Sequence, residues 1–391
     1  MKLFIKYVIV SGIVFSSFII FSNLTADHAV KLPVIESDTT LSIIFAGDIM
    51  QHKMQIDAAW DDSLQAYSYD SCFKYVAPLI RENDLAIANF EFTLGGPPYS
   101  GYPQFSAPDQ TVNALLYAGF DIVGTANNHS CDRGSKGIER TIHILDSMGL
   151  KHMGTYKDSA SRATSFPMII HKKGFKLALL NYTYGTNGIP ARYPNIVNLI
   201  DEAQIKSDLK QAKDSLPDKI IVFIHWGDEY KSYPNQYQEY YEKVCLDHGA
   251  DIIIGMHPHV IQKIERMYYP DSNGREVFVA WSLGNYVSNQ RDRYRDGGLM
   301  VKIDLIKKHN KVRIADCGYY LSWVYTPDEN GKRKFYIVPA DKFSKFPGFL
   351  DSASYNKMQL YISDSRMLMQ QESKGISEFR YDVKTDFWKK E

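Results

Sequence analysis

The sequence predicts an α/β fold that becomes rich in β-strands toward its end. In the first two-thirds of the chain, short apolar runs alternate with segments that carry apolar residues at helical spacing. Most of the apolar runs end on polar residues, as buried strands do where they reach the edge of a sheet. Between residues 277 and 338 only strand patterns follow one another. These observations, with no internal linker, indicate one large domain.

The expected elements alternate in a regular order. Strands of the α/β part are predicted at Leu41–Phe45, Asn83–Asn89, Phe120–Val123, Lys173–Asn181, Lys219–Ile224 and Asp251–Ile254. Helices are predicted between them at Cys72–Arg81, Gln110–Ala118, Gly137–Met148, Asp201–Ser215 and Pro234–His248. The β-rich part comprises Val277–Ser282, Gly298–Leu305, Lys311–Ser322 and Phe335–Val338. A helix and a polar tail are expected over Ser352–Glu391.

The amino-terminal segment predicts export from the cytoplasm. Lys2 and Lys6 precede an apolar run from Tyr7 to Phe21, an arrangement typical of a secretory signal. Residues 1–26 are expected to be a cleaved signal peptide or a retained membrane anchor, because the run is short beside the roughly 20 apolar residues of a full span. A linker over 27–38, a domain over 39–340 and a helical, polar extension over 341–391 complete the expected organisation. The protein is then extracytoplasmic, in the periplasm or at the cell surface.

Composition argues against some classes of function. The chain has 45 basic and 45 acidic residues, so it lacks the positive charge that a nucleic-acid partner requires. Its four cysteines are scattered without paired spacing, which does not predict a disulfide framework or a cysteine-rich metal site.

Potential metal ligands follow the predicted strands. They are Asp48, Glu91, Asn128, His225, His257 and His259, and His129 stands beside Asn128 at the same strand end. Ligands of open α/β sheets gather outside the carboxyl ends of the strands, so we expect these side chains to converge. Carboxylate, amide and imidazole groups are the ligand set of sites that hold two divalent ions about 3.5 to 4 Å apart. His257 and His259, one residue apart just past a strand, can aim at the same small volume.

The motifs resemble those of the CapA family of capsule and poly-γ-glutamate biosynthesis proteins, whose domain is similar to calcineurin-like metallophosphoesterases. The matching blocks are Ala46-Gly47-Asp48-Ile49-Met50, Asn89-Phe90-Glu91, Ala126-Asn127-Asn128-His129 with Asp132-Arg133-Gly134, His225-Trp226-Gly227-Asp228-Glu229, Gly255-Met256-His257-Pro258-His259-Val260-Ile261-Gln262 and Ser282-Leu283-Gly284-Asn285-Tyr286. In this order they are far more specific than any single block. The resemblance implies a metallophosphatase-like α-β-β-α sandwich with two mixed sheets.

The resemblance also implies roles for individual residues. Asp48 matches the first metal ligand and Glu91 the bridging carboxylate, and the remaining metal ligands match Asn128, His225, His257 and His259. His129 matches the catalytic histidine that serves as general acid or charge stabiliser. One or two divalent ions are implied, and manganese, zinc and iron are not distinguished.

One position departs from the superfamily pattern. Met50 stands where the superfamily has a histidine, and a thioether is a poor ligand for such ions. His52 either compensates as a ligand or lies in a solvated loop.

Further residues are expected around the ligands. Asn127, Asp132 and Glu229 are predicted to hold the ligands through hydrogen bonds or to cap local structure. Asn285 is a predicted substrate contact. Arg291, with Arg293 and Arg295, either receives an anionic substrate or forms a solvated run of charge.

Two functions from different classes follow. The first is an extracytoplasmic hydrolase of the cell envelope, in which a metal-bound water attacks a phosphoester or amide of an anionic polymer. The second is a non-catalytic accessory protein that holds a polymer, or a membrane-bound polymer synthase or export protein, and keeps a vestigial metal site. A glycosidase using Asp48 and Glu91 ranks third, because it leaves the histidines unexplained.

Overall fold

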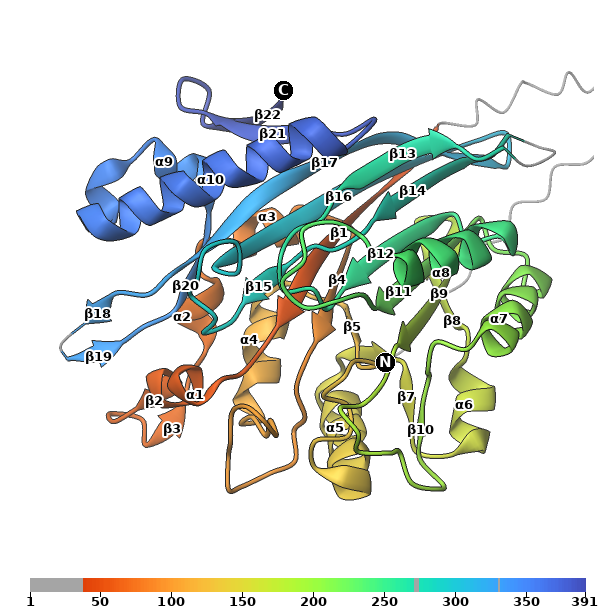
Figure 1. Cartoon of the computed structure of the whole chain (residues 1–391), viewed down its shortest axis with the longest axis horizontal. Helices are drawn as coiled ribbons and strands as arrows, with labels where there is room; N and C mark the ends of the chain where they lie inside the picture. Colours follow the sequence, from red (N-terminus) through yellow and green to blue (C-terminus); the bar gives the residue numbers. More distant parts are fainter. Residues whose placement is uncertain (1–37, 271–273, 330) are drawn as a thin grey trace, which may run out of the picture. The chain divides into compact units, whose positions relative to one another are not determined.

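Two β-sheets pack face to face, and helices cover the outer face of each sheet (Figure 1). This computed structural model describes residues 38–270, 274–329 and 331–391, so the expected signal or anchor lies outside the described residues. None of the helices in the described ranges is long and apolar enough to cross a membrane. The α-β-β-α layering is the architecture that the family resemblance implied.

The first sheet has ten strands and is mixed. Its main path runs β22 (Phe387–Lys390), β21 (Ser377–Asp382), β17 (Lys311–Tyr325), β16 (Gly297–Lys308), β1 (Thr39–Ile49), β4 (Leu85–Phe90), β5 (Ile122–Gly124) and β6 (Lys151–Met153). β15 (Asn285–Val287) pairs with β1, and β20 (Tyr336–Pro339) pairs with β17. β1, β4, β5 and β6 are parallel neighbours, so their carboxyl ends share one edge.

The second sheet has six strands. Its order is β13 (Ile264–Tyr268), β14 (Glu276–Ala280), β12 (Ile252–Met256), β11 (Lys219–His225), β9 (Phe175–Thr183) and β8 (Met168–Lys172). The four central strands are parallel and the two edge strands antiparallel.

Alternation along β1 explains how one strand supports two cores. Leu41, Ile43 and Phe45 face the second sheet, while Ile44 and Ala46 face the helices on the other side. Helices α2 (Asp70–Phe73), α3 (Ala77–Arg81), α4 (Gln110–Ala118) and α5 (Gly134–Met148) cover that side, and α7 (Glu202–Asp214) and α8 (Gln236–Asp247) cover the second sheet. Because both faces of the strand are buried, its middle is the apolar run of residues 43–46 and not an alternating pattern.

The smaller elements lie mainly in connections. They are α1 (Lys53–Ala59), β2 (Trp60–Asp61), β3 (Ala66–Tyr67), β7 (Thr155–Tyr156), α6 (Ser159–Ser165), β10 (Ile196–Val197), β18 (Asp328–Glu329), β19 (Lys332–Arg333), α9 (Ala340–Ser344) and a 3₁₀ turn at Pro347–Phe349.

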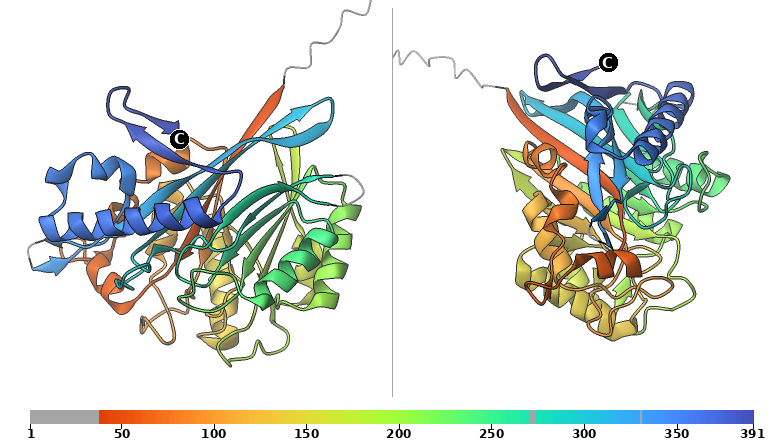
Figure 2. Two further views of the ribbon diagram at one scale, coloured as in Figure 1. Left: turned by 45° about the horizontal axis from the view of Figure 1, so that its top comes forward. Right: turned by 90° about the vertical axis from the view of Figure 1, so that its left-hand side faces the viewer.

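The carboxyl-terminal stretch differs from its expectation. Helix α10 (Ser352–Glu372) was predicted, but the residues after it form β21 and β22 instead of a polar tail. β21 pairs with β17, and the apolar side of α10 packs into the core between the sheets through Met358 and Ile362. Figure 2 shows α10 and the two strands lying against the first sheet. Such short strands are stabilised by their partners, which local sequence does not reveal.

A second difference concerns the strand expected at Lys173–Asn181. Lys173 and Gly174 have positive φ angles of 47° and 77° and form the turn of a hairpin between β8 and β9. The strand therefore starts at Phe175. It also continues two residues beyond the expected end, to Thr183, so Tyr184 follows it.

Candidate metal centre

The carboxyl ends of strands from both sheets deliver the predicted metal ligands to one place. Asp48 is the second-last residue of β1, Glu91 follows β4, and Asn128 and His129 lie in the loop after β5. From the second sheet, His225 ends β11, and His257 and His259 follow β12. All seven side chains are buried, with at most 3% of each residue exposed. The structure therefore brings the six predicted metal ligands and the predicted catalytic His129 together.

Glu91 belongs to two groups of residues that could hold a cation. One group is Glu91, His257 and His259, and the other is Asp48, Glu91 and His225, with the ligand atoms of each group within 4.8 Å of one another. Glu91 Oε1 lies 3.7 Å from His225 Nε2 and 3.7 Å from His259 Nε2. A carboxylate shared in this way is the arrangement of a bridging ligand between two ions.

Electrostatics and hydrogen bonding show that the residues fit a divalent cation. Burial and the neighbouring Asp48 raise the pKa of Glu91 well above its usual value. Burial and the neighbouring imidazoles lower the pKa of His225 and His257 well below theirs, which favours the neutral rings that ligate metals. Among the described residues, Glu91 Oε1 and His257 Nδ1 are buried without a hydrogen-bond partner. Unpaired buried polar atoms are costly, and a cation at this point would satisfy them.

Asn89 is a member of this cluster that sequence reasoning missed. Its Nδ2 donates to Asp48 Oδ1 (2.8 Å) and Glu91 Oε2 (3.4 Å), and it lies 3.3 Å from His225 Nδ1. Asn128 Oδ1 lies 3.0 Å from His225 Nε2. Asn89 was visible as a polar residue inside an apolar strand, two residues before Glu91, and that pattern could have identified it.

The predicted catalytic histidine is held by a carboxylate. His129 Nδ1 lies 2.8 Å from Asp132 Oδ2, and the same oxygen accepts the backbone N–H of Phe105 at 2.7 Å. Asn127 accepts from the backbone N–H of His129 and donates to the carbonyl oxygen of Phe90 at the end of β4. Asp132 thus fixes the ring of His129, and Asn127 fixes the loop that carries it.

Backbone geometry around the ligands is specialised. β12 ends at Met256, and His257 and His259 have positive φ angles of 99° and 59°, so the pair lies in a turn past the strand. Non-glycine residues in this region are uncommon and cluster at functional sites. The backbone N–H of His257 donates to Asp48 Oδ2 (3.3 Å). Gly47 allows β1 to approach the backbone at Gly284 closely, because a Cβ at position 47 would lie 2.0 Å from the Gly284 carbonyl oxygen.

Met50 and His52 do not belong to either group of ligands. Met50 is 1% exposed and packs in the apolar cluster beneath the helices of the first sheet. His52 caps α1, and its Nδ1 accepts the backbone N–H of Asn289 at 3.3 Å. Burial lowers the pKa of His52 to about 4. His52 is thus a partly buried helix cap, and neither a solvated histidine nor a ligand of the two groups.

We expect Met50→His to destabilise the protein without adding a metal ligand. Placing an imidazole in an apolar cluster costs about 2–3 kcal/mol of unfolding free energy. The measurement is chemical denaturation together with metal content per chain. Met50→Leu is the matched control and should change stability by less than about 1.5 kcal/mol. A higher metal content in the histidine variant would contradict this packing.

The predicted substrate contacts have partners within the protein. Asn285 Oδ1 lies 3.1 Å from His259 Nδ1, while its Nδ2 donates to the Arg295 carbonyl oxygen and to Gln290. Asn285 therefore orients His259. Arg291 donates to the carbonyl oxygens of Asp296 and Val324, and burial lowers its pKa to about 10. These contacts occupy the guanidinium group, and its predicted role with an anionic substrate stays a prediction.

Other side chains border the ligands. Tyr184, at the end of β9, is 40% exposed with its ring centroid 4.5 Å from that of His257. Arg295 lies over the ring of Tyr230, which is 6.0 Å from His259. Glu229 is exposed, and its charge contributes to the raised pKa values of Glu91 and Tyr184. Tyr184 was missed because the strand was expected to end at Asn181, whereas β9 continues to Thr183.

Comparison with known proteins identifies the family. The sequence model of the bacterial capsule synthesis protein family PGA_cap matches residues 42–290. The chain belongs to this family. All the predicted metal ligands lie within the matched segment, and the match confirms the family that the motifs predicted.

Two relatives of this PGA_cap protein are CapA proteins of Bacillus species. It is 30% identical over 279 residues to the capsule biosynthesis protein CapA of Bacillus anthracis, covering 66% of this chain and 63% of that one. It is 30% identical over 287 residues to the PGA biosynthesis protein CapA of Bacillus subtilis (strain 168), covering 68% of each. The chain thus spans slightly less than two-thirds of the length of the first relative.

Solved structures are similar at lower identity. The chain is 15% identical to the NAD nucleotidase NadN of Haemophilus influenzae, with a TM-score of 0.47 over 90% of this chain and 66% of that one. It is also 15% identical to the calcineurin-like phosphoesterase YfkN of Bacillus subtilis, with a TM-score of 0.41 over 84% of this chain and 98% of that one.

Proposed function

We propose that this PGA_cap protein is an extracytoplasmic, metal-dependent hydrolase of capsule, poly-γ-glutamate or exopolysaccharide biosynthesis. Its substrate is a phosphoester or amide of an anionic polymer. The observation that supports the proposal is the buried Glu91 carboxylate, shared by two groups of ligands and lacking a hydrogen-bond partner on Oε1 within the described structure. A purely structural carboxylate would be paired, because burying it otherwise is costly.

The residues have distinct tasks in this proposal. Asp48, Glu91, Asn128, His225, His257 and His259 would hold one or two divalent ions, which supply Lewis acidity and lower the pKa of bound water. Asp132 accepts a hydrogen bond from Nδ1 of His129. This contact fixes the tautomer and leaves Nε2 as the nitrogen that exchanges a proton with the reacting group. Arg295 lies over the ring of Tyr230 and pairs with Asp292. In this proposal it would exchange that partner for an anionic group of the substrate.

A second candidate is an accessory protein of the envelope. In that case the chain binds polymer, or a membrane-bound synthase or export protein, and its amino terminus attaches it to the membrane if the signal is uncleaved. The observation that favours this candidate is Met50, since its burial in an apolar cluster leaves the site with one imidazole fewer than the superfamily pattern.

Metal content and turnover of the full-length protein separate the two candidates. We expect one to two equivalents of metal after loading with manganese or zinc, and hydrolysis of a generic phosphate monoester or diester or of a γ-glutamyl amide. His257→Ala should lower the metal content and reduce turnover by on the order of 10³-fold or more, because a ligand is lost. His248→Ala is a control, because His248 lies at the end of α8, outside both groups.

Two outcomes would count against hydrolysis. If no cation binds, or if loaded protein turns over none of these substrates, the accessory role gains support. Recovery of a synthase or export protein after cross-linking in the native membrane would then support that role directly.

A further inference from the structure

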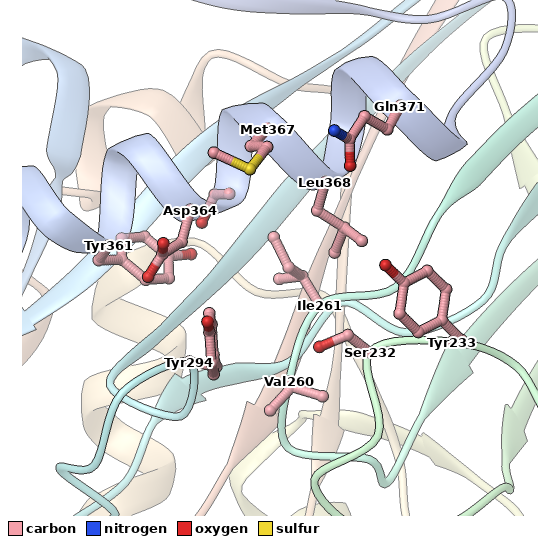
Figure 3. A pocket seen from close by; sticks show the side chains of 11 residues that line it. Ser232, Tyr233, Val260, Ile261, Tyr294, Tyr361, Asp364, Met367, Leu368 and Gln371 are labelled. Carbon is pink, nitrogen blue, oxygen red and sulfur yellow. The ribbon is translucent and has the colours of Figure 1, made fainter.

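A cavity lies beside the metal centre, between helix α10 and the loops that follow His259 and Tyr230 (Figure 3). Its volume is about 240 Å³. Val260 and Ile261 line it. Val260 directly follows the proposed ligand His259, and consecutive Cα atoms are about 3.8 Å apart. Most of its other residues lie beyond residue 290, outside the segment that the family model matches.

We propose that this cavity binds a neutral sugar ring, which would make it a saccharide subsite next to the metal centre. The inference extends the proposed function by naming a glycan as part of the polymer.

The lining has the two kinds of surface that a sugar ring presents. The floor is apolar, with Val260, Ile261 and Leu368, and the partly exposed rings of Tyr233 and Tyr294 stand on two sides of Ile261 (Figure 3). The negative face of an aromatic ring attracts the positively polarised C–H groups on the face of a sugar. The volume lies below the roughly 300–1,000 Å³ of sites for larger ligands, so a single ring is the appropriate size.

Free polar groups surround this floor. Ser232, Tyr233 and Gln371 have polar atoms with no hydrogen bond to other described residues, and they are available to pair with sugar hydroxyls. A hydrocarbon chain would cover these groups without pairing them, which is unfavourable. The lining therefore favours a ligand that is rich in hydroxyl groups over a lipid chain.

The charge of the cavity favours a neutral ligand. The carboxylate of Asp364 accepts two hydrogen bonds of 2.8 Å from Arg293, so the two charges neutralise each other. Among the described residues that line the cavity, none carries an unpaired positive charge. A γ-glutamyl chain carries one carboxylate per residue, so this cavity would not neutralise it.

The cavity is also preformed. Tyr361 on α10 donates to the carbonyl oxygen of Gly298 at 2.8 Å, and Arg366 pairs with Glu378 at 2.8 Å. These contacts hold α10 against the sheet, which reduces the ordering cost when a ligand binds.

Saturation-transfer NMR and calorimetry on the full-length protein test the inference. The probes are the neutral tetrasaccharides maltotetraose, cellotetraose and chitotetraose, with tetra-γ-glutamate as the charged comparison. We expect at least one neutral tetrasaccharide to bind with a Kd of roughly 1 mM or below, in the presence of a chelator as well as in its absence. Tyr294→Ala should weaken that binding about tenfold, and Tyr294→Phe by less than about threefold, because the ring supplies most of the contact.

Controls separate the cavity from the metal centre. Tyr268→Ala removes a tyrosine that is 77% exposed and does not line the cavity, so it should leave sugar binding unchanged. Failure of hydrolysis would overturn the proposed function and leave the sugar measurement intact, because binding is measured without metal or turnover. The inference is overturned if none of the neutral tetrasaccharides binds, if their binding survives Tyr294→Ala, or if tetra-γ-glutamate competes for the cavity.

Discussion

Glu91→Gln is expected to remove most of the bound metal and to lower hydrolysis by on the order of 10³-fold or more. Glu91 is the residue shared by both groups of ligands, so its loss weakens both positions at once. The amide keeps the size of the side chain but not its charge, and cannot bridge two cations as a carboxylate does. Metal per chain after dialysis and the rate on the best phosphate or amide substrate are the two measurements.

The control for this variant is Glu229→Gln. Glu229 is exposed and lies outside both groups, so the protein should keep its metal. In the metal-free state we expect Glu91→Gln to be at least as stable as the parent protein at pH 7–8, because the buried acid has a raised pKa and ionises at a cost. When the pKa of an acid is higher in the folded state than in the unfolded state, the unfolding free energy falls as the pH rises from the unfolded-state pKa through the folded-state pKa. Retention of full metal content in Glu91→Gln would rule out the shared-carboxylate site.

His129→Asn is expected to lower turnover by about 10²–10⁴-fold while leaving the metal content unchanged. His129 is buried beside the ligands but belongs to neither metal-holding group, and its Nδ1 is engaged by Asp132. The substitution removes the proton-exchanging nitrogen and keeps a polar side chain. Metal content and kcat, measured on the same preparation, test the prediction.

Asp132→Asn provides the matched comparison for His129. It leaves the imidazole in place but weakens the contact that fixes its tautomer, so we expect a smaller fall in kcat and a shifted pH–rate profile. Asp132 also accepts from the backbone N–H of Phe105, so thermal unfolding is needed to separate a positioning effect from a loss of stability. A His129→Asn protein with normal turnover would exclude the proton-transfer role, whatever its metal content.

The sequence anticipated the site because strand ends carry local signals. Asp48, Glu91, His225 and His257 each follow a buried apolar run, and parallel strands place such ends at one edge. The order of motifs added the family, and with it the layered architecture. Prediction was weaker where structure depends on distant partners: β21 and β22 form strands because β17 and its neighbours are there to pair with them.

Tertiary structure decided the role of residues whose partners lie far away in the chain. Asn285 was expected at the substrate, but it is turned toward His259 by contacts from Arg295 and Gln290. Arg291 lies over the ring of Trp323 and donates to the carbonyl oxygen of Val324. Met50 packs in an apolar cluster. A sequence gives the type of each side chain, while the direction in which it points depends on the neighbours that compete for its hydrogen bonds and apolar surface.

Local patterns were enough to predict the α/β class, the family and a set of strand-end ligands, because apolar periodicity and motif order are properties of the chain alone. The tertiary structure added that Asn89 completes the cluster and that His257 and His259 reach it from a turn with positive φ angles. It also created the cavity under α10, which requires segments more than 90 residues apart in the chain. Convergence of this kind arises when two sheets pack on a common core, and no local pattern encodes that packing.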